Sequence, residues 1–301
     1  MMKNPVIKEK AGDPYIMKDQ DKYYLVATGG GKENVNEFVC WQSSDLADWS
    51  EPISILKLSE VSWAKTNGWA PCMVEVDGYY YFAFCADQQI GIAVCNQPMG
   101  RFHDLLGKPL IAKEDYDFQT IDPVFLKDDD GKIYFAFGQG RCMISEINST
   151  PTSAEFVGEM ICLSEMLYRQ SSHMRDQFDI SIYNEAPDLI KIGEKYLFSW
   201  SVYDVLDYRY GIRYAWSKYP MGPYYMPIDF ERDNILMQGH HDITGCGHAC
   251  ITEYRGEYYI FYGRHSKNWW AEGIGRDICC EKIIFEDEYH LKAIPRAISE
   301  D

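Results

Sequence analysis

Five short segments of the chain share a pattern in which a fixed position precedes an apolar run, and three of the five have an acid there. The acids are Asp13 in Gly-Asp-Pro-Tyr, Asp122 in Ile-Asp-Pro and Glu185 in Glu-Ala-Pro. The other two segments, Trp-Ala-Pro and Gly-His-Ala, have Ala70 and His248 at that position. A single Asp-Pro dipeptide is an ordinary turn signal, so one such segment would be explained by a turn. Five in register instead predict three carboxyl groups and an imidazole gathered at one site.

Three carboxyl groups in one cleft have the chemistry needed to cleave a glycosidic bond. Like charges in a confined site raise the pKa of one member, because ionised carboxylates repel each other. A carboxyl that stays protonated can donate its proton to the leaving oxygen, while one that stays ionised can activate a water molecule. A third can orient the acid and keep its pKa raised. The residue types therefore predict a glycoside hydrolase.

The elements that would hold these residues are predicted to be β-hairpins. In each copy an apolar run is followed by a turn of Asp, Gly, Lys or Glu and then by an aromatic run. Glycine supplies the positive φ that such turns need, and β-branched and aromatic residues favour strands. An aromatic residue stands eleven residues after the fixed position in four copies and twelve after Asp122, whose DDDG turn is longer. The predicted hairpins span residues 11–30, 69–85, 120–140, 184–201 and 247–263.

Five copies of this unit predict an all-β fold, a five-bladed β-propeller whose four-stranded antiparallel blades surround a central axis. The fixed positions lie 57, 52, 63 and 63 residues apart, and a third strand-like run follows several hairpins. Repeats of about 40–50 residues with four strands each are typical of propeller blades. An irregular β-sandwich is the alternative, but it offers no reason for the constant internal spacing. We interpret residues 1–301 as a single propeller domain whose innermost strands bring the five positions to one end of the axis.

Composition limits the partners and the location. The formal net charge of −17 argues against a nucleic-acid partner, because phosphate binding needs a surplus of Lys and Arg. No apolar run approaches the ~20 residues of a membrane helix, and the start MMKNPVIKEK lacks the apolar stretch of a signal peptide. The ten cysteines form no CxxC pair, and most lie in apolar runs, where a thiol behaves as a small hydrophobic residue. A cytoplasmic location is predicted, although a secreted protein trimmed of its signal would look the same.

The motifs, taken in this order, resemble glycoside hydrolase family 43, the five-bladed propeller enzymes that act on arabinose- and xylose-containing glycans. The resemblance runs from about residue 4 to beyond Arg276, with motifs at 12–15, 43–49, 69–71, 121–123, 185–187 and 247–249. It implies an inverting mechanism with Asp13 as general base and Glu185 as general acid. It also implies that Asp122 tunes the pKa and the orientation of Glu185. An inverting pair of carboxyl groups should lie roughly 6.5–9.5 Å apart, and a retaining pair roughly 5–5.5 Å.

The resemblance also assigns three residues around the acids. Trp69 would form a wall of the sugar pocket, and Arg276 would contact the substrate, with a surface ion pair as the other interpretation of Arg276. His248 matches the family's axial histidine, which often lies beside a bound cation, commonly Ca²⁺ held largely through water. A hydrogen-bonded histidine that fills the channel is the alternative, because no Asp/Glu-rich oxygen cage is visible beside it. The chemistry itself is expected to need no cofactor.

Three other functions stay open on the sequence. A sugar-binding propeller without catalysis would keep Trp69 but would not need three acids in register. A glycoside phosphorylase would need a cationic pocket for phosphate, for which Arg276, Arg213 and Arg264 are candidates. A retaining fructan-cleaving propeller would have Asn-Asp-Pro-Asn, Arg-Asp-Pro and Glu-Cys in place of Gly-Asp-Pro-Tyr, Ile-Asp-Pro and Glu-Ala.

The expected substrate is a short oligosaccharide cleaved from its end. The family commonly has Glu-Gly-Pro where this chain has Glu-Ala-Pro at 185–187, a small change that leaves the acid in place. The loops that would select the sugar, at 29–36, 88–90 and 166–181, show no pattern from which the sugar or the linkage can be predicted. The oligomeric state is not predicted either.

Overall fold

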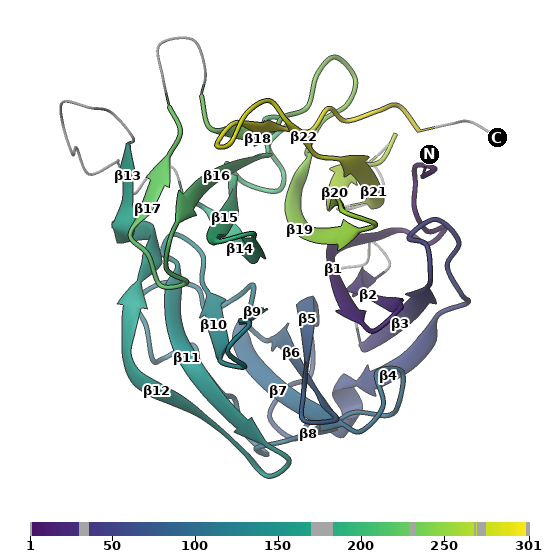
Figure 1. Ribbon diagram of the computed structural model, residues 1–301. Helices are drawn as coiled ribbons and strands as arrows, with labels where there is room; N and C mark the ends of the chain where they lie inside the picture. Colours follow the sequence, from purple (N-terminus) through teal and green to yellow (C-terminus); the bar gives the residue numbers. More distant parts are fainter. Residues whose placement is uncertain are drawn as a thin grey trace.

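The computed structural model describes residues 2–29, 36–169, 183–228, 233–267, 269 and 275–298. These residues form strands and two short 3₁₀ helices, and no α-helix occurs among them. Five sheets stand around one axis, each with its first hairpin strand innermost (Figure 1). The predicted all-β five-bladed propeller is confirmed, while the single domain over residues 1–301 stays a prediction. The loops at 29–36 and 166–181 fall largely outside the described residues.

The first three blades have the predicted four antiparallel strands, each paired with the next in sequence. Blade one consists of β1 Ala11–Asp19, β2 Lys22–Gly29, β3 Glu37–Ser43 and β4 Ile53–Lys57, followed by the 3₁₀ helix η1 Leu58–Glu60. Blade two consists of β5 Trp69–Val76, β6 Tyr79–Ala86, β7 Gln89–Cys95 and β8 His103–Asp104. Blade three consists of β9 Val124–Lys127, β10 Ile133–Phe137, β11 Met143–Thr150 and β12 Ser153–Cys162.

The last two blades depart from the four-stranded prediction in their described parts. Blade four consists of β14 Glu185–Ile192, β15 Lys195–Val202, β16 Gly211–Ser217, β17 Tyr224–Met226, β18 Ile235–Met237 and β13 Leu167–Arg169. Its sixth strand arises because the chain leaving blade three, after η2 Leu163–Met166, adds β13 parallel to β17 on the outer edge. Blade five consists of β19 Gly247–Tyr254, β20 Glu257–His265 and β21 Arg276–Lys282. A separate hairpin, β22 Ile284–Phe285 and β23 Leu291–Lys292, follows.

The N-terminal segment closes the ring by binding the last strand of blade five. The Val6 N–H donates to the Ile278 carbonyl at 2.8 Å. The Asn4 side chain accepts the Cys280 N–H at 2.9 Å and donates to Glu281 at 2.8 Å. The first and last described segments lie side by side, and Arg296 donates from Nη2 to the Met2 carbonyl at 3.2 Å. The first residues therefore supply the pairing that a fourth strand would give to blade five.

At or just before the start of each innermost strand, one residue lies in the left-handed region of backbone conformation. The pairing of β1 with β2 shifts register between Gly12 and Tyr15, and similar shifts occur in blades two, four and five. Such a bulge re-aims a side chain. A positive φ is uncommon outside glycine, so five in register mark one repeated unit. The five residues are Asp13 (52°), Ala70 (42°), Asp122 (58°), Ala186 (55°) and His248 (46°).

This register corrects one assignment made from the sequence. The spacing equates Glu185 with Asp13, but the left-handed residue of blade four is Ala186. The strand pairing agrees. In blade one, Met17 pairs with Tyr24, and these residues lie four and eleven positions after Asp13. In blade four, Ile190 pairs with Leu197, and these lie four and eleven positions after Ala186, whereas the spacing of eleven from Glu185 ends at the preceding residue, Tyr196. Glu185 therefore occupies the place of Trp69 in blade two, one residue before the left-handed position.

Side chains from the preceding blade accept the N–H of three left-handed residues. The bonds are Ala70 N–H to Thr28 Oγ1 (2.7 Å), Asp122 N–H to Cys85 Sγ (3.1 Å) and His248 N–H to Ser201 Oγ (2.8 Å). In blade three the equivalent residue is Gly138, whose N–H bonds the Ile121 carbonyl and which has no side chain to offer. There the carboxyl of Asp122 itself accepts the Ala186 N–H at 3.0 Å. Asp122 is thus tied to the backbone directly after Glu185.

Five apolar clusters fill the interfaces between neighbouring blades. Between blades one and two, the ring of Phe38 meets that of Phe82 edge-on at 5.2 Å, an arrangement favoured by the opposite charges of ring edge and face. The interface of blades five and one joins Phe261 to Leu25. This continuous core fixes the ends of the innermost strands, where the predicted site lies. The part of the chain that the structure describes has no helix long and apolar enough to cross a membrane.

Candidate active site

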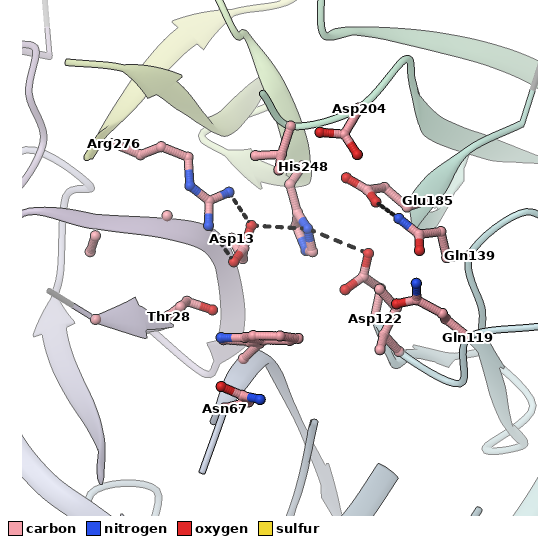
Figure 2. A pocket seen from close by; sticks show the side chains of 16 residues that line it. Asp13, Thr28, Asn67, Gln119, Asp122, Gln139, Glu185, Asp204, His248 and Arg276 are labelled. Carbon is pink, nitrogen blue, oxygen red and sulfur yellow. Dashed lines mark hydrogen bonds and ion pairs between the residues drawn. The ribbon is translucent and has the colours of Figure 1, made fainter. Parts of the chain in front are cut away.

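The starts of the innermost strands surround a cavity of about 600 Å³ (Figure 2). Six residues singled out in the sequence line it, and together they come from all five blades: Asp13, Trp69, Asp122, Glu185, His248 and Arg276. The three acids are nearly buried, with no more than 7% of each residue exposed. The structure thus brings the acids into one hollow, while the roles assigned to them stay predictions.

Asp13 is held as a carboxylate by a buried cation. Arg276 donates from Nη2 to Asp13 Oδ2 at 2.6 Å and from Nη1 to Oδ1. His248 Nδ1 lies 3.1 Å from Asp13 Oδ1. Burial disfavours the ionised carboxyl, but the charge of Arg276, the contact with His248 and a hydrogen bond from Thr28 together hold the pKa of Asp13 well below its usual range. Asp13 is therefore ionised at neutral pH, as a general base must be.

The glycine of Gly-Asp-Pro-Tyr makes room for this cation. A Cβ on Gly12 would lie 2.3 Å from Arg276 Cζ, far inside van der Waals contact. Arg276 is 8% exposed, and Gly12 belongs to the same strand as Asp13, so the guanidinium lies against the β1 backbone. The interpretation of Arg276 as a surface ion pair is wrong, because its partner and its own side chain are both buried inside the cavity wall.

Glu185 is held by uncharged donors. Tyr210 donates its hydroxyl to Glu185 Oε1 at 2.7 Å, and Gln139 donates from Nε2 to Oε2 at 2.5 Å. Burial raises the pKa of Glu185 to about 7, against the pull of these two hydrogen bonds and with the repulsion of Asp13 and Asp204 added. Near neutral pH a large share of Glu185 is thus protonated, as a general acid must be. Neither Tyr210 nor Gln139 was among the residues predicted from the sequence.

Asp122 contacts the backbone beside Glu185 and not its carboxyl. No hydrogen bond joins the two carboxyl groups among the interactions of the described residues, and Asp122 Oδ2 instead accepts the Ala186 N–H. Burial first, and then the charges of Glu185 and Asp13, raise the pKa of Asp122 well above its usual range. Burial and repulsion between Asp122 and Glu185 therefore keep this pair of carboxyl groups partly protonated at a pH where an isolated carboxyl group in water would be ionised.

His248 places an uncharged imidazole next to Asp13. Burial lowers the pKa of His248 to about 4, so the imidazole is uncharged at neutral pH. A carboxylate only accepts hydrogen bonds, so the proton of the neutral ring belongs on Nδ1, which faces Asp13. Asp122 Oδ2 lies farther from the same nitrogen, at 3.7 Å. These contacts place His248 beside two of the acids, and the cation held through water stays a prediction.

The side chains around His248 do not form a direct metal cage. Among the described residues, no group of three or more His, Cys, Asp or Glu side chains has an arrangement that could hold an ion. Ca²⁺ takes six to eight oxygen ligands, and His248 with two carboxylates supplies too few of them. The residues therefore fit a directly bound Ca²⁺ poorly, and we derive no chemical step through one.

Several polar residues of the cavity were missed in the sequence because none belongs to one of the recurring motifs, and all but Thr28 lie outside the strands. They are Thr28, Asn67, Gln119, Gln139 and Asp204. Trp69 lines the cavity in a half-buried position, in agreement with its expected place in the wall. Of the three arginines considered for phosphate binding, only Arg276 lines the cavity, and its charge is already matched by Asp13.

Comparison with known protein families shows which family the chain belongs to. The profile of the glycosyl hydrolases family 43 matches residues 2–289 of the chain. The chain belongs to this family. Membership makes it a glycoside hydrolase of the inverting type and disfavours the binding-only, phosphorolytic and retaining alternatives.

Relatives with named activities are distant but extend over most of the chain. A β-D-galactofuranosidase of Aspergillus niger is 26% identical, over 94% of this chain and 82% of its own length. A xylosidase/arabinosidase of Thermoclostridium stercorarium is 24% identical, over 92% and 61%. An extracellular exo-α-(1→5)-L-arabinofuranosidase of Cellvibrio japonicus is 26% identical, over 82% and 77%.

Solved structures share the fold. A thermostable family-43 glycoside hydrolase has a TM-score of 0.79 at 22% identity, covering 100% of this chain and 98% of that one. A β-xylosidase/α-arabinofuranosidase from a compost metagenome, in complex with xylotriose, has a TM-score of 0.76 at 20% identity, covering 96% of each chain. At these identities the likeness supports the propeller architecture and nothing finer.

Proposed function

We propose that this hydrolase removes arabinofuranose or xylose units from the ends of short oligosaccharides, with Asp13 as general base and Glu185 as general acid. The observation that supports these roles most is the contrast in proton affinity within one cavity. Asp13 has a pKa well below its usual range, whereas that of Glu185 is raised to about 7. An inverting glycosidase needs one carboxyl in each state at the same pH.

In this mechanism the two carboxyl groups act on opposite faces of the sugar. Asp13 takes a proton from the water that attacks the anomeric carbon, while Glu185 gives its proton to the leaving oxygen. The bond from the anomeric carbon to the water oxygen forms as the glycosidic bond breaks. After turnover Asp13 is protonated and Glu185 ionised, and exchange with solvent restores both. We expect the two carboxyl groups to lie roughly 6.5–9.5 Å apart, with room for the water.

Asp122 supports the acid indirectly in this proposal. Its bond to the Ala186 N–H fixes the backbone that follows Glu185. The two acids repel each other when both are ionised, so whichever stays charged favours the proton on the other. This is the pKa-tuning role that the family resemblance implies, reached through charge and backbone contact.

The size and lining of the cavity support a small sugar as substrate. A volume of about 600 Å³ lies within the 300–1,000 Å³ common for small-molecule sites. Trp69 would offer an aromatic face to the apolar side of a sugar ring. The relatives named xylosidase/arabinosidase support arabinose and xylose, and the relative named β-D-galactofuranosidase adds a second five-membered sugar ring to consider.

A panel of nitrophenyl glycosides tests the proposal. We expect cleavage of α-L-arabinofuranoside or β-D-xyloside above β-D-galactofuranoside and β-D-galactopyranoside, with the inverted anomer appearing first by NMR. Asp13→Asn and Glu185→Gln should each remove turnover of natural oligosaccharides while leaving the circular dichroism spectrum unchanged. Cleavage of none of the panel, or full activity of Asp13→Asn, would refute the proposal.

Two further expectations are part of the proposal. The chemistry needs no bound metal, because Asp13 and Glu185 supply both proton transfers. The protein works in the cytoplasm, and its ten cysteines, all free thiols and mostly buried, support a reducing compartment. Fractionation of the native host with an antibody to the protein tests the location, and recovery from the medium or the cell surface would contradict it.

A further inference from the structure

Two uncharged side chains hold the carboxyl of Glu185 from two blades. Gln139 follows β10 in blade three and donates to Oε2, whereas Tyr210 precedes β16 in blade four and donates to Oε1. The Gln139 contact at Glu185 is visible in Figure 2. Because each oxygen of the carboxyl has its own donor, rotation of the carboxyl plane would break both bonds. The acid is therefore fixed in orientation by these two residues.

The Tyr210 hydroxyl is buried, and its acceptor is the carboxyl of Glu185. Tyr210 donates to Glu185 Oε1 at 2.7 Å. Ser201, whose Oγ accepts the backbone N–H of His248 at 2.8 Å, and Tyr210 are both no more than 1% exposed. Water therefore does not compete for the bond between Tyr210 and Glu185.

The glycine of Gly-His-Ala leaves space for the tyrosine ring. A Cβ on Gly247 would lie 2.1 Å from Cε1 of Tyr210, so only glycine lets the ring lie against the start of β19. The φ of Gly247 is not in the left-handed region, so close approach is its requirement here. The position of the tyrosine is accordingly built into the neighbouring blade.

We propose that Tyr210 and Gln139 are the positioning residues of the general acid, a task that the resemblance to the family assigns to Asp122. This inference rests on the proposed function, in which Glu185 is that acid. Asp122 accepts a hydrogen bond from the Ala186 backbone N–H and acts on Glu185 by charge. Tyr210 and Gln139 make the direct contacts and carry no charge of their own.

Removing a donor has an effect on Glu185 of known sign. Hydrogen bonds from Tyr210 and Gln139 favour the ionised carboxyl, so losing one raises the pKa of Glu185. A cavity that merely opened to water would instead lower it, because burial is the largest cause of the raised value. The charged and titratable groups that face the site stay in place in either case: Asp13, Asp122, Asp204, His248 and Arg276.

Leaving-group dependence separates a misplaced acid from a damaged fold. In Tyr210→Phe and Gln139→Leu we expect kcat/KM on natural oligosaccharides to fall about 10- to 100-fold, part of the ~10²–10⁴ that general acid catalysis supplies. With a dinitrophenyl leaving group, which departs without a proton, the loss should nearly vanish. Tyr224→Phe is the matched control, because this buried tyrosine of blade four donates only to the Pro220 carbonyl. An equal loss on both substrates, or the same loss in the control, would overturn the proposal.

A titration without turnover separates this inference from the proposed function. In protein with ¹³C-labelled glutamate carboxyls, the Glu185 signal is identified by its absence in Glu185→Gln. Its midpoint should move to higher pH in Tyr210→Phe and stay in place in Tyr224→Phe. A midpoint that is unchanged or lower in Tyr210→Phe would contradict the positioning role. Should the wild type cleave no glycoside, the proposed function would fail while this titration still tested the contact.

Discussion

Asp13 and Glu185 occupy the same cavity with nearly the same exposure, 7% and 6%, yet their proton affinities differ in direction. Each has donors on both carboxyl oxygens. Arg276 brings a full positive charge with its donors, so it cancels the charge that burial makes costly. Tyr210 and Gln139 bring donors alone, so desolvation still dominates at Glu185. The comparison teaches that burial pushes both pKa values upward, and that hydrogen-bond donors reverse this at Asp13, where they bring a positive charge, but not at Glu185.

The largest expected effect comes from exchanging each acid for its amide. Asp13→Asn and Glu185→Gln should each lower kcat on oligosaccharides by about 10²–10⁴. With a dinitrophenyl glycoside, Glu185→Gln should recover most of its activity, whereas Asp13→Asn should stay inactive because water still needs a base. Steady-state kinetics on the two substrates check this pattern. A rescue of Asp13→Asn instead would exchange the two roles.

A smaller effect should follow from removing the charge beside Asp13. In Arg276→Met, burial acts on Asp13 without its main opposing charge, so the pKa of Asp13 rises. The base is ionised only above that pKa, and the acid limb of the kcat/KM profile should move to higher pH. Arg276→Lys keeps the charge but not the paired donors, so its acid limb should fall in between. An acid limb unchanged in Arg276→Met would mean that Arg276 does not control the base.

The same variant should lose stability in a pH-dependent way. Leaving one partner of a buried ion pair alone costs about 3–5 kcal/mol. Because the folded pKa of Asp13 is depressed, the pair stabilises fully above the unfolded pKa of about 3.9 and less as the pH falls below it. The difference in unfolding free energy between Arg276→Met and wild type should therefore be largest near neutral pH and shrink toward pH 2. Urea unfolding at several pH values measures it.

The sequence predicted the blades and the acids because both depend on local pattern. Hairpin spacing recurs within about twenty residues, Asp13 lies at the start of β1, and Asp122 lies two residues before β9. The sequence alignment of blade four was wrong by one residue. Leu197 occupies the strand position that is aromatic in the other blades, and the aromatic residue before it, Tyr196, was aligned there instead. Ala186, where the family commonly has glycine, was the available signal, since glycine suits the left-handed conformation found there.

The donors to Glu185 could not be found in the same way. Gln139 and Tyr210 are 46 and 25 residues from Glu185 in the chain. Gln139 reaches Glu185 because blades three and four pack side by side, and Tyr210 reaches it because β16 and β14 both pair with β15 in blade four. Neither forms a motif with its neighbours. Arg276 was proposed from resemblance, but its pairing with Asp13 depends on ring closure, which brings β21 of blade five beside β1 of blade one.

Two glycines that face Arg276 provide a further test of whether the guanidinium controls the pKa of Asp13. A Cβ at Gly12 would lie 2.3 Å from the guanidinium carbon, whereas one at Gly263 would lie 3.5 Å from Arg276 Cδ, an ordinary contact. Gly12→Ala should displace the guanidinium, at a stability cost of about 1–3 kcal/mol, and move the acid limb in the same direction as Arg276→Met. Gly263→Ala should change neither the unfolding midpoint nor the acid limb appreciably. Equal behaviour of the two variants would show that the guanidinium is not confined by β1.

The smallest expected effect concerns a cation near His248. Asp13 already has the guanidinium of Arg276 as its partner and lies 3.1 Å from His248 Nδ1, and the described side chains form no three-ligand site. The charge of Asp13 is therefore matched without a metal. Treatment with EDTA should leave kcat/KM unchanged, and added Ca²⁺ should not raise it. A melting temperature that rises with Ca²⁺ at constant rate would identify an ion held through water as a structural group. Activity lost in EDTA and restored by Ca²⁺ would instead make the cation a third partner of the acids, and the contrast between Asp13 and Glu185 would no longer depend on protein donors alone.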